Sequence, residues 1–143
     1  MEQKIESLEQ FENKAQEFAR GLRPRAHEAT LITLSGELGA GKTAFVKATA
    51  KALGVEDVVN SPTFVLEKIY ALSDQPFKRL IHIDAYRLES GAGLAPLRFD
   101  ELMKDPHTLV MLEWPEKVAD GLPQAAVSIS IQGEGNARTI TYG

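Results

Sequence analysis

The stretch GELGAGKTAF, residues 36–45, decides the fold. It satisfies the spacing G-x-x-x-x-G-K-[ST] with four residues, Gly36, Gly41, Lys42 and Thr43. Glycines let a backbone curl so that consecutive N–H groups point at phosphate oxygens, and a following helix adds unpaired N–H groups and a partial positive charge. The lysine can reach the outer phosphates of a nucleoside triphosphate, and the threonine hydroxyl can bind Mg²⁺. The stretch therefore predicts a phosphate-binding loop.

The segments on both sides of the loop have the pattern that such a loop needs. Residues 29–36, ATLITLSG, predict a buried β-strand, and residues 43–54, TAFVKATAKALG, predict a helix that ends in glycine. Further upstream, apolar residues recur at helical spacing over residues 8–22, and Ser7 and Gln10 occupy the positions of a capping box at its start. The order of strand, loop and helix argues against a chance match to the loop pattern.

The rest of the chain predicts further strands and one short helix. The predicted strands are residues 63–70, 78–86, 108–114, 126–132 and 137–142. The last two flank a Gly-Glu-Gly-Asn turn and predict an antiparallel hairpin, whereas residues 98–105 predict a short helix at most. Strands that alternate with helices indicate an α/β fold. We expect a single-domain P-loop NTPase fold over residues 1–143, with a mostly parallel central sheet, an antiparallel C-terminal hairpin and helices on both faces.

Composition and charge narrow the class of protein. The chain has 143 residues, 43% of them hydrophobic and 25% charged, which is typical of one compact globular domain. Its net charge of −4 has the wrong sign for a protein that binds nucleic acid by itself, so a partner is expected to hold any RNA. The absence of cysteine excludes disulfides and thiolate metal sites. No apolar run approaches the roughly 18 residues that span a bilayer, and the polar start lacks a signal-peptide pattern, so we expect a cytoplasmic protein without a membrane partner.

Two acids follow predicted strands and are candidates for the second metal anchor that a P-loop site needs. Glu113 ends the apolar run TLVMLE, and Asp84 ends the run RLIHID, which His82 interrupts. Both acids are expected at the carboxyl edge of a parallel sheet, one as metal anchor and the other orienting a water molecule. We expect His82 to be packed or paired rather than catalytic.

Five segments in chain order, GELGAGKT, SPTF, HIDAYRL, FDEL and LEWPEK, together resemble the TsaE family of small bacterial P-loop ATPases, which are needed to make threonylcarbamoyladenosine in tRNA. The resemblance covers nearly the whole chain, and SPTF and HIDAYRL make it far more specific than the loop alone. It implies a chain that binds ATP and Mg²⁺ and hydrolyses ATP slowly by itself. It also implies that the chain works with TsaD and TsaB, which transfer the threonylcarbamoyl group to adenosine 37 of tRNA. In that role it meets tRNA only through the complex and resets the complex between turnovers.

The resemblance also implies roles for single residues. The phosphate-binding run comprises Gly39, Ala40, Gly41, Lys42, Thr43 and Ala44. Thr43 and Glu113 match the pair that holds Mg²⁺. Asp84 matches an acid near the γ-phosphate and is, with Lys42, a candidate for catalysis.

Four further candidate residues lie outside the phosphate loop, in or beside the segments that resemble the family. Thr63 in the switch-like SPTF loop and Arg138 in the C-terminal hairpin match residues that contact the nucleotide. Trp114 matches a tryptophan next to the metal-binding acid and is expected to be a core aromatic that closes the site. Arg87 could act on the γ-phosphate or pair with Glu89 or Asp100 on the surface, and the sequence leaves both readings open.

Three other classes of function share parts of this pattern. A small-molecule kinase has the same loop, but it needs a second substrate pocket and a basic lid, and the arginines after the loop are scattered singly. A GTPase is unsupported because the Asn-Lys pair at residues 13–14 is not followed by the aspartate of an Asn-Lys-x-Asp motif. A module that uses ATP only to hold a complex together stays open. The adenine pocket is expected between the first helix and the C-terminal hairpin.

Overall fold

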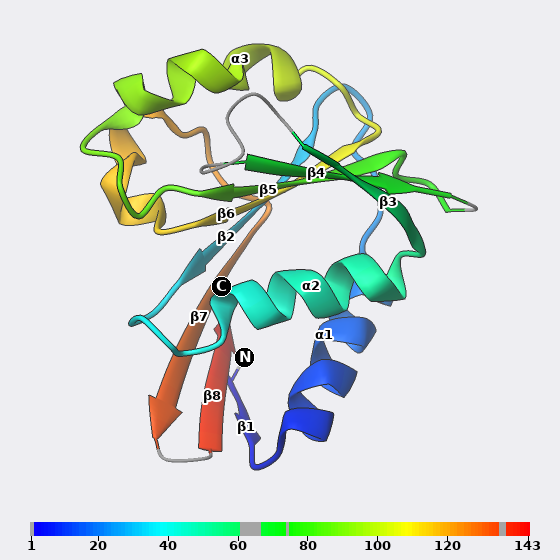
Figure 1. Ribbon diagram of the computed structural model, residues 1–143, viewed down its shortest axis with the longest axis vertical. Helices are drawn as coiled ribbons and strands as arrows, with labels where there is room; N and C mark the ends of the chain where they lie inside the picture. Colours follow the sequence, from blue (N-terminus) through cyan, green and yellow to red (C-terminus); the bar gives the residue numbers. More distant parts are fainter. Residues whose placement is uncertain (1, 61–66, 74, 135–136) are drawn as a thin grey trace.

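The computed structural model describes residues 2–60, 67–73, 75–134 and 137–143. In these residues eight strands form one mixed sheet in the order β1-β8-β7-β2-β6-β5-β4-β3 (Figure 1). The strands are β1 (Glu2–Ile5), β2 (Thr30–Ser35), β3 (Val55–Asn60), β4 (Glu67–Leu72), β5 (Arg79–Asp84), β6 (Thr108–Glu113), β7 (Val127–Glu134) and β8 (Ala137–Tyr142). The helices are α1 (Leu8–Gly21), α2 (Lys42–Ala52) and α3 (Phe99–Leu102), with 3₁₀ segments η1 (Gly91–Leu97), η2 (Pro115–Lys117) and η3 (Ala119–Gly121). The predicted α/β class is confirmed.

Parallel strands form the centre of the sheet, as predicted. β2 pairs in parallel with β6 and β7, and β5 pairs in parallel with β6. Such strands are covered on both faces and read as continuous apolar runs, and every residue of β6 is buried. The carboxyl ends of these strands meet at one edge, which is where open α/β sheets bind ligands.

Antiparallel pairs complete both sides of the sheet. β7 and β8 form the predicted C-terminal hairpin, and β1 adds to the free side of β8. On the opposite side β4 pairs with β5, and β3 pairs with β4. The antiparallel part is therefore larger than the predicted hairpin alone.

Two strands, β1 and β3, and the three 3₁₀ segments were not predicted. β1 reads EQKI with Ile5 as its buried residue, so its strand conformation comes from pairing with β8 rather than from a local pattern. β3 likewise pairs with a single neighbour at the sheet edge. The strand predicted over residues 63–70 is seen from Glu67 onward and continues to Leu72, while residues 63–66 lie outside the described residues. The short helix predicted at 98–105 is α3, and η1 precedes it.

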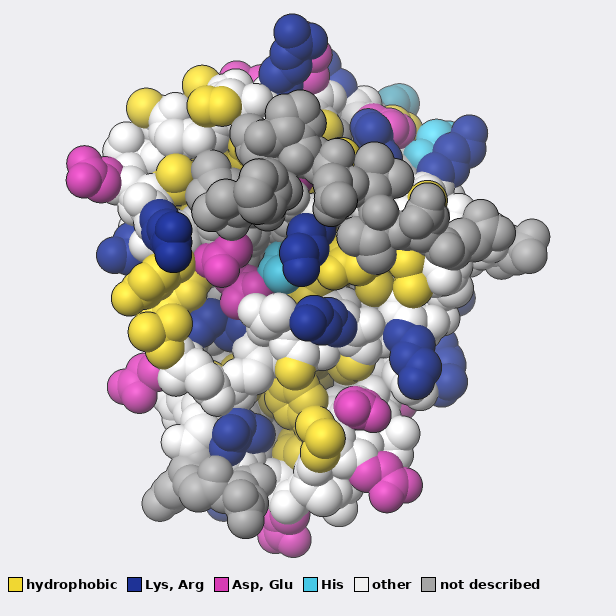
Figure 2. Space-filling view, viewed as in Figure 1, with side chains coloured by type: hydrophobic (Ala, Val, Ile, Leu, Met, Phe, Trp, Pro, Cys, Tyr) yellow, Lys and Arg dark blue, Asp and Glu magenta, His cyan; other side chains and the backbone are white. Residues whose placement is uncertain are grey.

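Helices cover both faces of the sheet, as predicted (Figure 1). α1 and α2 lie on one face, where the rings of Phe11 and Phe45 pack edge to face with centroids 5.9 Å apart. On the other face η1 and α3 bring Leu94, Leu97 and Phe99 into a second apolar cluster. The surface in the same view mixes acidic, basic and hydrophobic side chains (Figure 2). The two clusters hold the helices on the sheet, because burial of apolar surface stabilises the folded chain by about 25 cal/mol per Å².

Helix α1 begins at Ser7, the N-cap of the predicted capping box, but the return bond of Gln10 goes to the N–H of Glu6 and not to that of Ser7. Ser7 Oγ accepts a hydrogen bond from the N–H of Gln10 at 3.1 Å, and Gln10 Oε1 accepts one from the N–H of Glu6 at 3.0 Å. The helix buries Phe11 and Ala15 against the sheet. Of the helices that the structure describes, none has the length and apolar character to cross a membrane.

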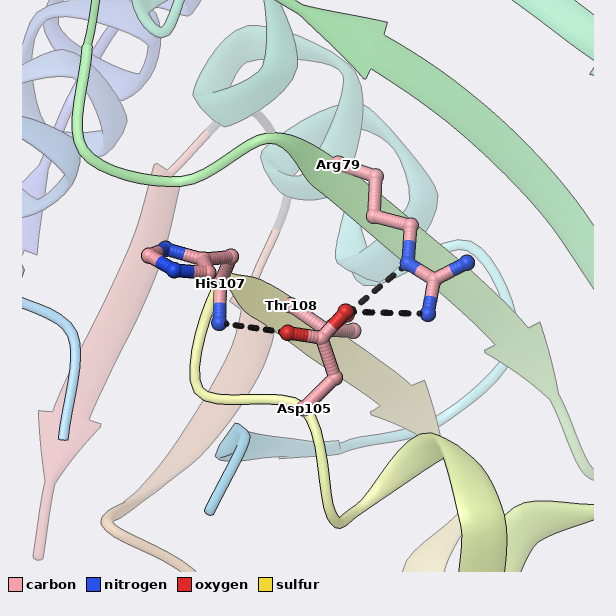
Figure 3. Close-up of polar contacts among 4 residues, drawn as sticks. All are labelled: Arg79, Asp105, His107 and Thr108. Atoms are coloured by element: carbon pink, nitrogen blue, oxygen red, sulfur yellow. Dashed lines mark hydrogen bonds and ion pairs between the residues drawn. The ribbon is translucent and has the colours of Figure 1, made fainter. Parts of the chain in front are cut away.

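At the amino edge of the sheet, Asp105 connects the start of β5 to the start of β6 (Figure 3). Its Oδ1 accepts a hydrogen bond from the N–H of His107 at 2.9 Å, and its Oδ2 accepts from Thr108 Oγ1 at 3.1 Å and from Arg79 Nη2 at 3.2 Å. Arg79 Nε also donates to Thr108 Oγ1 at 2.8 Å. The N–H of His107, followed by Thr108 and the charge of Arg79, lowers the pKa of Asp105 below its ordinary value of 3.8, against the opposing effect of its partial burial.

We expect Asp105→Ala to lower the free energy of unfolding by about 1 kcal/mol at neutral pH, because the carboxylate accepts three hydrogen bonds but is partly exposed. Since the pKa of Asp105 is lower in the folded chain, its contribution is present above 3.8 and is lost as the pH falls through the folded-state value. Urea unfolding at neutral and at acid pH measures both effects. The control is Glu89→Ala, which removes an exposed acid. Equal losses for the two variants at neutral pH would contradict the prediction.

Candidate functional site

The phosphate loop connects the end of β2 to the start of α2. Gly36, Gly39 and Gly41 have φ values of 146°, 81° and 114°. A Cβ at Gly36 would overlap the carbonyl oxygen of Ile131 in β7, so this position needs glycine for space as well as for conformation. Gly41 is the N-cap of α2, and in the described part of the chain no side chain caps this helix and no acid lies in its first turn. The start of α2 therefore keeps N–H groups available to an anion.

Lys42 folds back over the loop. Its Nζ donates to the carbonyl oxygens of Gly36 at 2.6 Å and Glu37 at 2.9 Å, and it lies 4.2 Å from the centre of the Trp114 ring. Burial lowers the pKa of Lys42 from its ordinary value of 10.5, and the attraction of nearby carboxylates, chiefly Glu113, opposes this effect. The ammonium group is thus held by carbonyl dipoles and an aromatic face at the predicted phosphate position.

Thr43 and Glu113, the predicted metal pair, lie in direct contact. Thr43 Oγ1 donates to the Glu113 carboxylate, with distances of 3.1 Å to Oε1 and 2.9 Å to Oε2. His82 Nε2 also contacts Oε2 of Glu113, so His82 is paired, as expected. Both His82 and Glu113 are buried. Among the described residues no group of three or more His, Cys, Asp and Glu side chains could hold a metal ion by itself.

Asp84 lies next to this pair. It is the last residue of β5 and stands opposite Glu113 in the parallel register of β5 and β6. Its Oδ1 accepts a hydrogen bond from the N–H of Tyr86 at 3.0 Å, and its side chain is half-buried. A cavity of about 250 Å³ opens here. It is lined by these predicted residues: Gly39, Gly41, Lys42, Thr43, Ala44, Asp84, Glu113 and Trp114.

Arg138 lies on the other side of the loop. Its Nε donates to the carbonyl oxygen of Ala40 at 2.9 Å, and its Nη2 lies 3.5 Å from the carbonyl oxygen of Gly39. Arg138 and Ala40 also line a second cavity of about 500 Å³, between the start of α1 and the loop. A cavity thus exists where the adenine pocket is predicted, and its role as that pocket stays a prediction.

Sequence reasoning missed several residues that line the two cavities. Leu8 and Phe11 of α1 line the larger cavity, but their helical spacing indicates only a core stripe. Leu8 is nevertheless 68% exposed. Leu38 and Tyr86, which are also exposed, line the smaller cavity. The sequence gives a signal for Leu38 alone: it is an apolar residue at one of the four unspecified positions of the G-x-x-x-x-G-K-[ST] pattern.

The remaining predicted residues have different outcomes. Thr63 lies outside the described residues. Trp114 is half-buried with φ of 63°, and its ring lies against Lys42 and, at 4.9 Å between centroids, against Tyr86. Arg87 is exposed and, within the part of the chain that the structure describes, pairs with no acid. Figure 2 shows acidic, histidine and basic side chains together near the middle of the face that carries the start of α2.

A glycine-rich loop between a central parallel strand and a helix, with a buried acid from the neighbouring strand at the helix start, defines a P-loop NTPase fold. Comparison with known families gives the particular one. The model of the threonylcarbamoyl adenosine biosynthesis protein TsaE matches residues 5–140, and the chain belongs to the TsaE family.

Individual relatives agree with this assignment. The chain is 36% identical over 117 residues to the tRNA threonylcarbamoyladenosine biosynthesis protein TsaE of Streptomyces coelicolor, which covers 80% of this chain and 76% of that protein. It is 37% identical over 118 residues to TsaE of Bacillus subtilis, and this match covers 82% of this chain and 71% of that protein. It is 38% identical over 116 residues to TsaE of Treponema pallidum, and this match covers 80% of this chain and 82% of that protein. The crystal structure of YdiB from Bacillus subtilis superposes with a TM-score of 0.75 at 29% identity, covering 99% of this chain and 83% of that one.

We expect Gly36→Ala to lower the free energy of unfolding by about 2 kcal/mol or more, because the added Cβ overlaps the backbone of β7 in a conformation that alanine rarely adopts. Gly21→Ala is the matched control. Gly21 ends α1, and nothing lies within 4 Å of its added Cβ, so this change should stay within about 0.5 kcal/mol. Urea unfolding of both variants measures the difference. A Gly36→Ala protein as stable as the control would show that the loop does not pack on β7 as described.

Proposed function

We propose that the chain is a weak, Mg²⁺-dependent ATPase that supports threonylcarbamoyl transfer to adenosine 37 of tRNA by a TsaB–TsaD complex, and that it resets this complex between turnovers. The contact of Thr43 with the buried Glu113 carboxylate, beside Lys42 at the start of α2, carries the ATPase part of the proposal. Membership of the TsaE family supports the part in tRNA threonylcarbamoyladenosine biosynthesis.

The loop fits the phosphates of a nucleotide. The uncapped start of α2 offers N–H groups, and the first turn has no acid that would repel an anion. Lys42 adds a buried cation, which donates hydrogen bonds to the carbonyl oxygens of Gly36 and Glu37. Gly39, Ala40, Gly41 and Ala44 would hold phosphate through backbone contacts.

The pair of Thr43 and Glu113 fits Mg²⁺. This ion prefers oxygen ligands and is often held by one or two protein oxygens together with phosphate oxygens and water. One hydroxyl and one carboxylate in contact satisfy that requirement without a cluster of acids. Bound Mg²⁺ would neutralise negative charge on the phosphates.

Asp84 is suited to orient a water molecule. It lines the same cavity as Lys42 and Thr43, and the N–H of Tyr86 fixes one of its two carboxylate oxygens. The other oxygen can accept a proton or a hydrogen bond from water. Lys42 stabilises the negative charge that develops on the transferred phosphoryl oxygens.

The larger cavity suits the base of the nucleotide. Its volume of about 500 Å³ is within the usual range for ligand sites, and Leu8 and Phe11 give it apolar walls. Arg138 lies between this cavity and the loop, where it can contact the nucleotide. We propose that adenine binds there.

The lining of the phosphate cavity explains why activity should be weak without partners. Among the described residues no arginine lines it, although an arginine at the transferred phosphoryl group is worth a factor of about 10³–10⁵ in related enzymes. We propose that TsaB and TsaD complete the site. The net charge of −4 supports an indirect contact with tRNA through that complex. We propose that the complex works in the cytoplasm.

The first test is the rate of ATP hydrolysis by the protein alone and with TsaB and TsaD from the same organism. We expect the pair to raise the steady rate by roughly tenfold or more, because the missing activating group comes from a partner. The Lys42→Ala protein with the same partners is the control and should stay at background. A single burst without steady turnover would favour the alternative in which the chain uses ATP only to hold the complex together. A high rate without partners that a small metabolite increases would favour a small-molecule kinase.

A second test separates the two acids. Glu113→Ala should weaken the binding of Mg²⁺ with ATP by about tenfold or more, since it removes a metal ligand. Asp84→Ala should change binding by less than about threefold but lower hydrolysis by about 10²-fold or more. Titration calorimetry and phosphate release, measured on both variants, give the comparison. Equal effects on nucleotide affinity would exclude this division of roles.

A further inference from the structure

His82 is a buried histidine beside the site to which the proposed function gives no role. It lies within β5, opposite Lys68 of β4 and Met111 of β6, and is 7% exposed. Its neighbours Ile81 and Ile83 belong to the apolar cluster on the η1 and α3 face. Because side chains alternate along a strand, His82 points to the face that carries α2. A buried imidazole is costly without a hydrogen-bond partner, so its partner identifies what it does.

That partner is the carboxylate of Glu113. His82 Nε2 contacts Oε2 of Glu113, the same oxygen that accepts from Thr43 Oγ1 at 2.9 Å. The carboxylate is therefore held from two elements, α2 and β5, while it projects from a third, β6. When Glu113 is ionised, Nε2 must carry the proton and act as the donor. His82 is not taken as a ligand itself, because Mg²⁺ prefers oxygen ligands and an imidazole ring offers only nitrogen.

We propose that His82 is a positioning residue for Mg²⁺ binding: its Nε2–H fixes the side chain of Glu113 so that the carboxylate faces the Thr43 hydroxyl. The inference rests on the proposed function, since it takes Glu113 as a Mg²⁺ ligand. Glutamate has three side-chain torsions, and a single bond to Thr43 leaves the carboxylate able to turn. Partners that orient a metal ligand in this way change metal affinity by about 10–100-fold when they are removed.

The test compares His82→Phe with His82→Gln. Phenylalanine fills the buried volume without a donor, whereas the amide of glutamine can place an N–H near the position of Nε2. Titration calorimetry with a non-hydrolysable ATP analogue, once with Mg²⁺ and once with EDTA, gives the gain in affinity that Mg²⁺ produces. We expect His82→Phe to lose about tenfold or more of this gain with its affinity in EDTA unchanged, and His82→Gln to keep most of the gain. A purely structural role would not produce this selective loss and rescue.

The outcomes are distinguishable. If His82→Phe keeps the wild-type gain, or if His82→Gln loses as much of it as His82→Phe, the inference is overturned while the proposed function stands. If the wild-type protein shows no gain from Mg²⁺, the proposed function fails and the inference fails with it. The melting temperature without nucleotide shows whether His82→Phe is folded. If it is not, His82→Asn, whose amide is too short to reach Glu113, takes its place in the comparison with His82→Gln.

Discussion

Glu113 carries a carboxylate that is 3% exposed at the end of an apolar strand, and a charge in such a place is stable only if donors surround it. The donors come from Thr43 in the first turn of α2 and His82 on β5. α2 can supply Thr43 only because the loop turns directly from the end of β2 into the helix. One buried carboxylate therefore joins α2 to the paired strands β5 and β6 through side-chain contacts.

The C-terminal hairpin is part of this arrangement and not an appendage. β7 runs parallel to β2, and its Ile131 lies so close to Gly36 that the loop admits no side chain there. Arg138 of β8 donates to the carbonyl oxygen of Ala40 on the far side of the loop. The loop is thus held from β7 and β8 on one side and from β6 on the other. Its curled conformation follows from packing as well as from its glycines.

How much of this could be read from the sequence depends on whether a feature is local. The loop, the buried run of β6 and the capping box of α1 are local patterns, and the structure confirms them as structural elements. β1 and β3 have no such pattern, because each becomes a strand only by pairing with a neighbour at a sheet edge. The same limit applies to the site. The acids Glu113 and Asp84 stand at strand ends and were found, whereas the contact of His82 with Glu113 depends on the register of two strands far apart in sequence.

The two cavities share Gly41 and Ala44, so the same turn of chain forms a wall of both. Phe11 of α1 lines the larger cavity and also packs edge to face on Phe45 of α2. A Cβ at Gly41 would lie 3.1 Å from the Phe11 ring, which shows how closely the helix approaches the loop. The distance between the two cavities is therefore set by the packing of α1 on α2. A base in one cavity and phosphates in the other would be held in relation to each other by an apolar core, which is stiffer than a loop because it is close-packed.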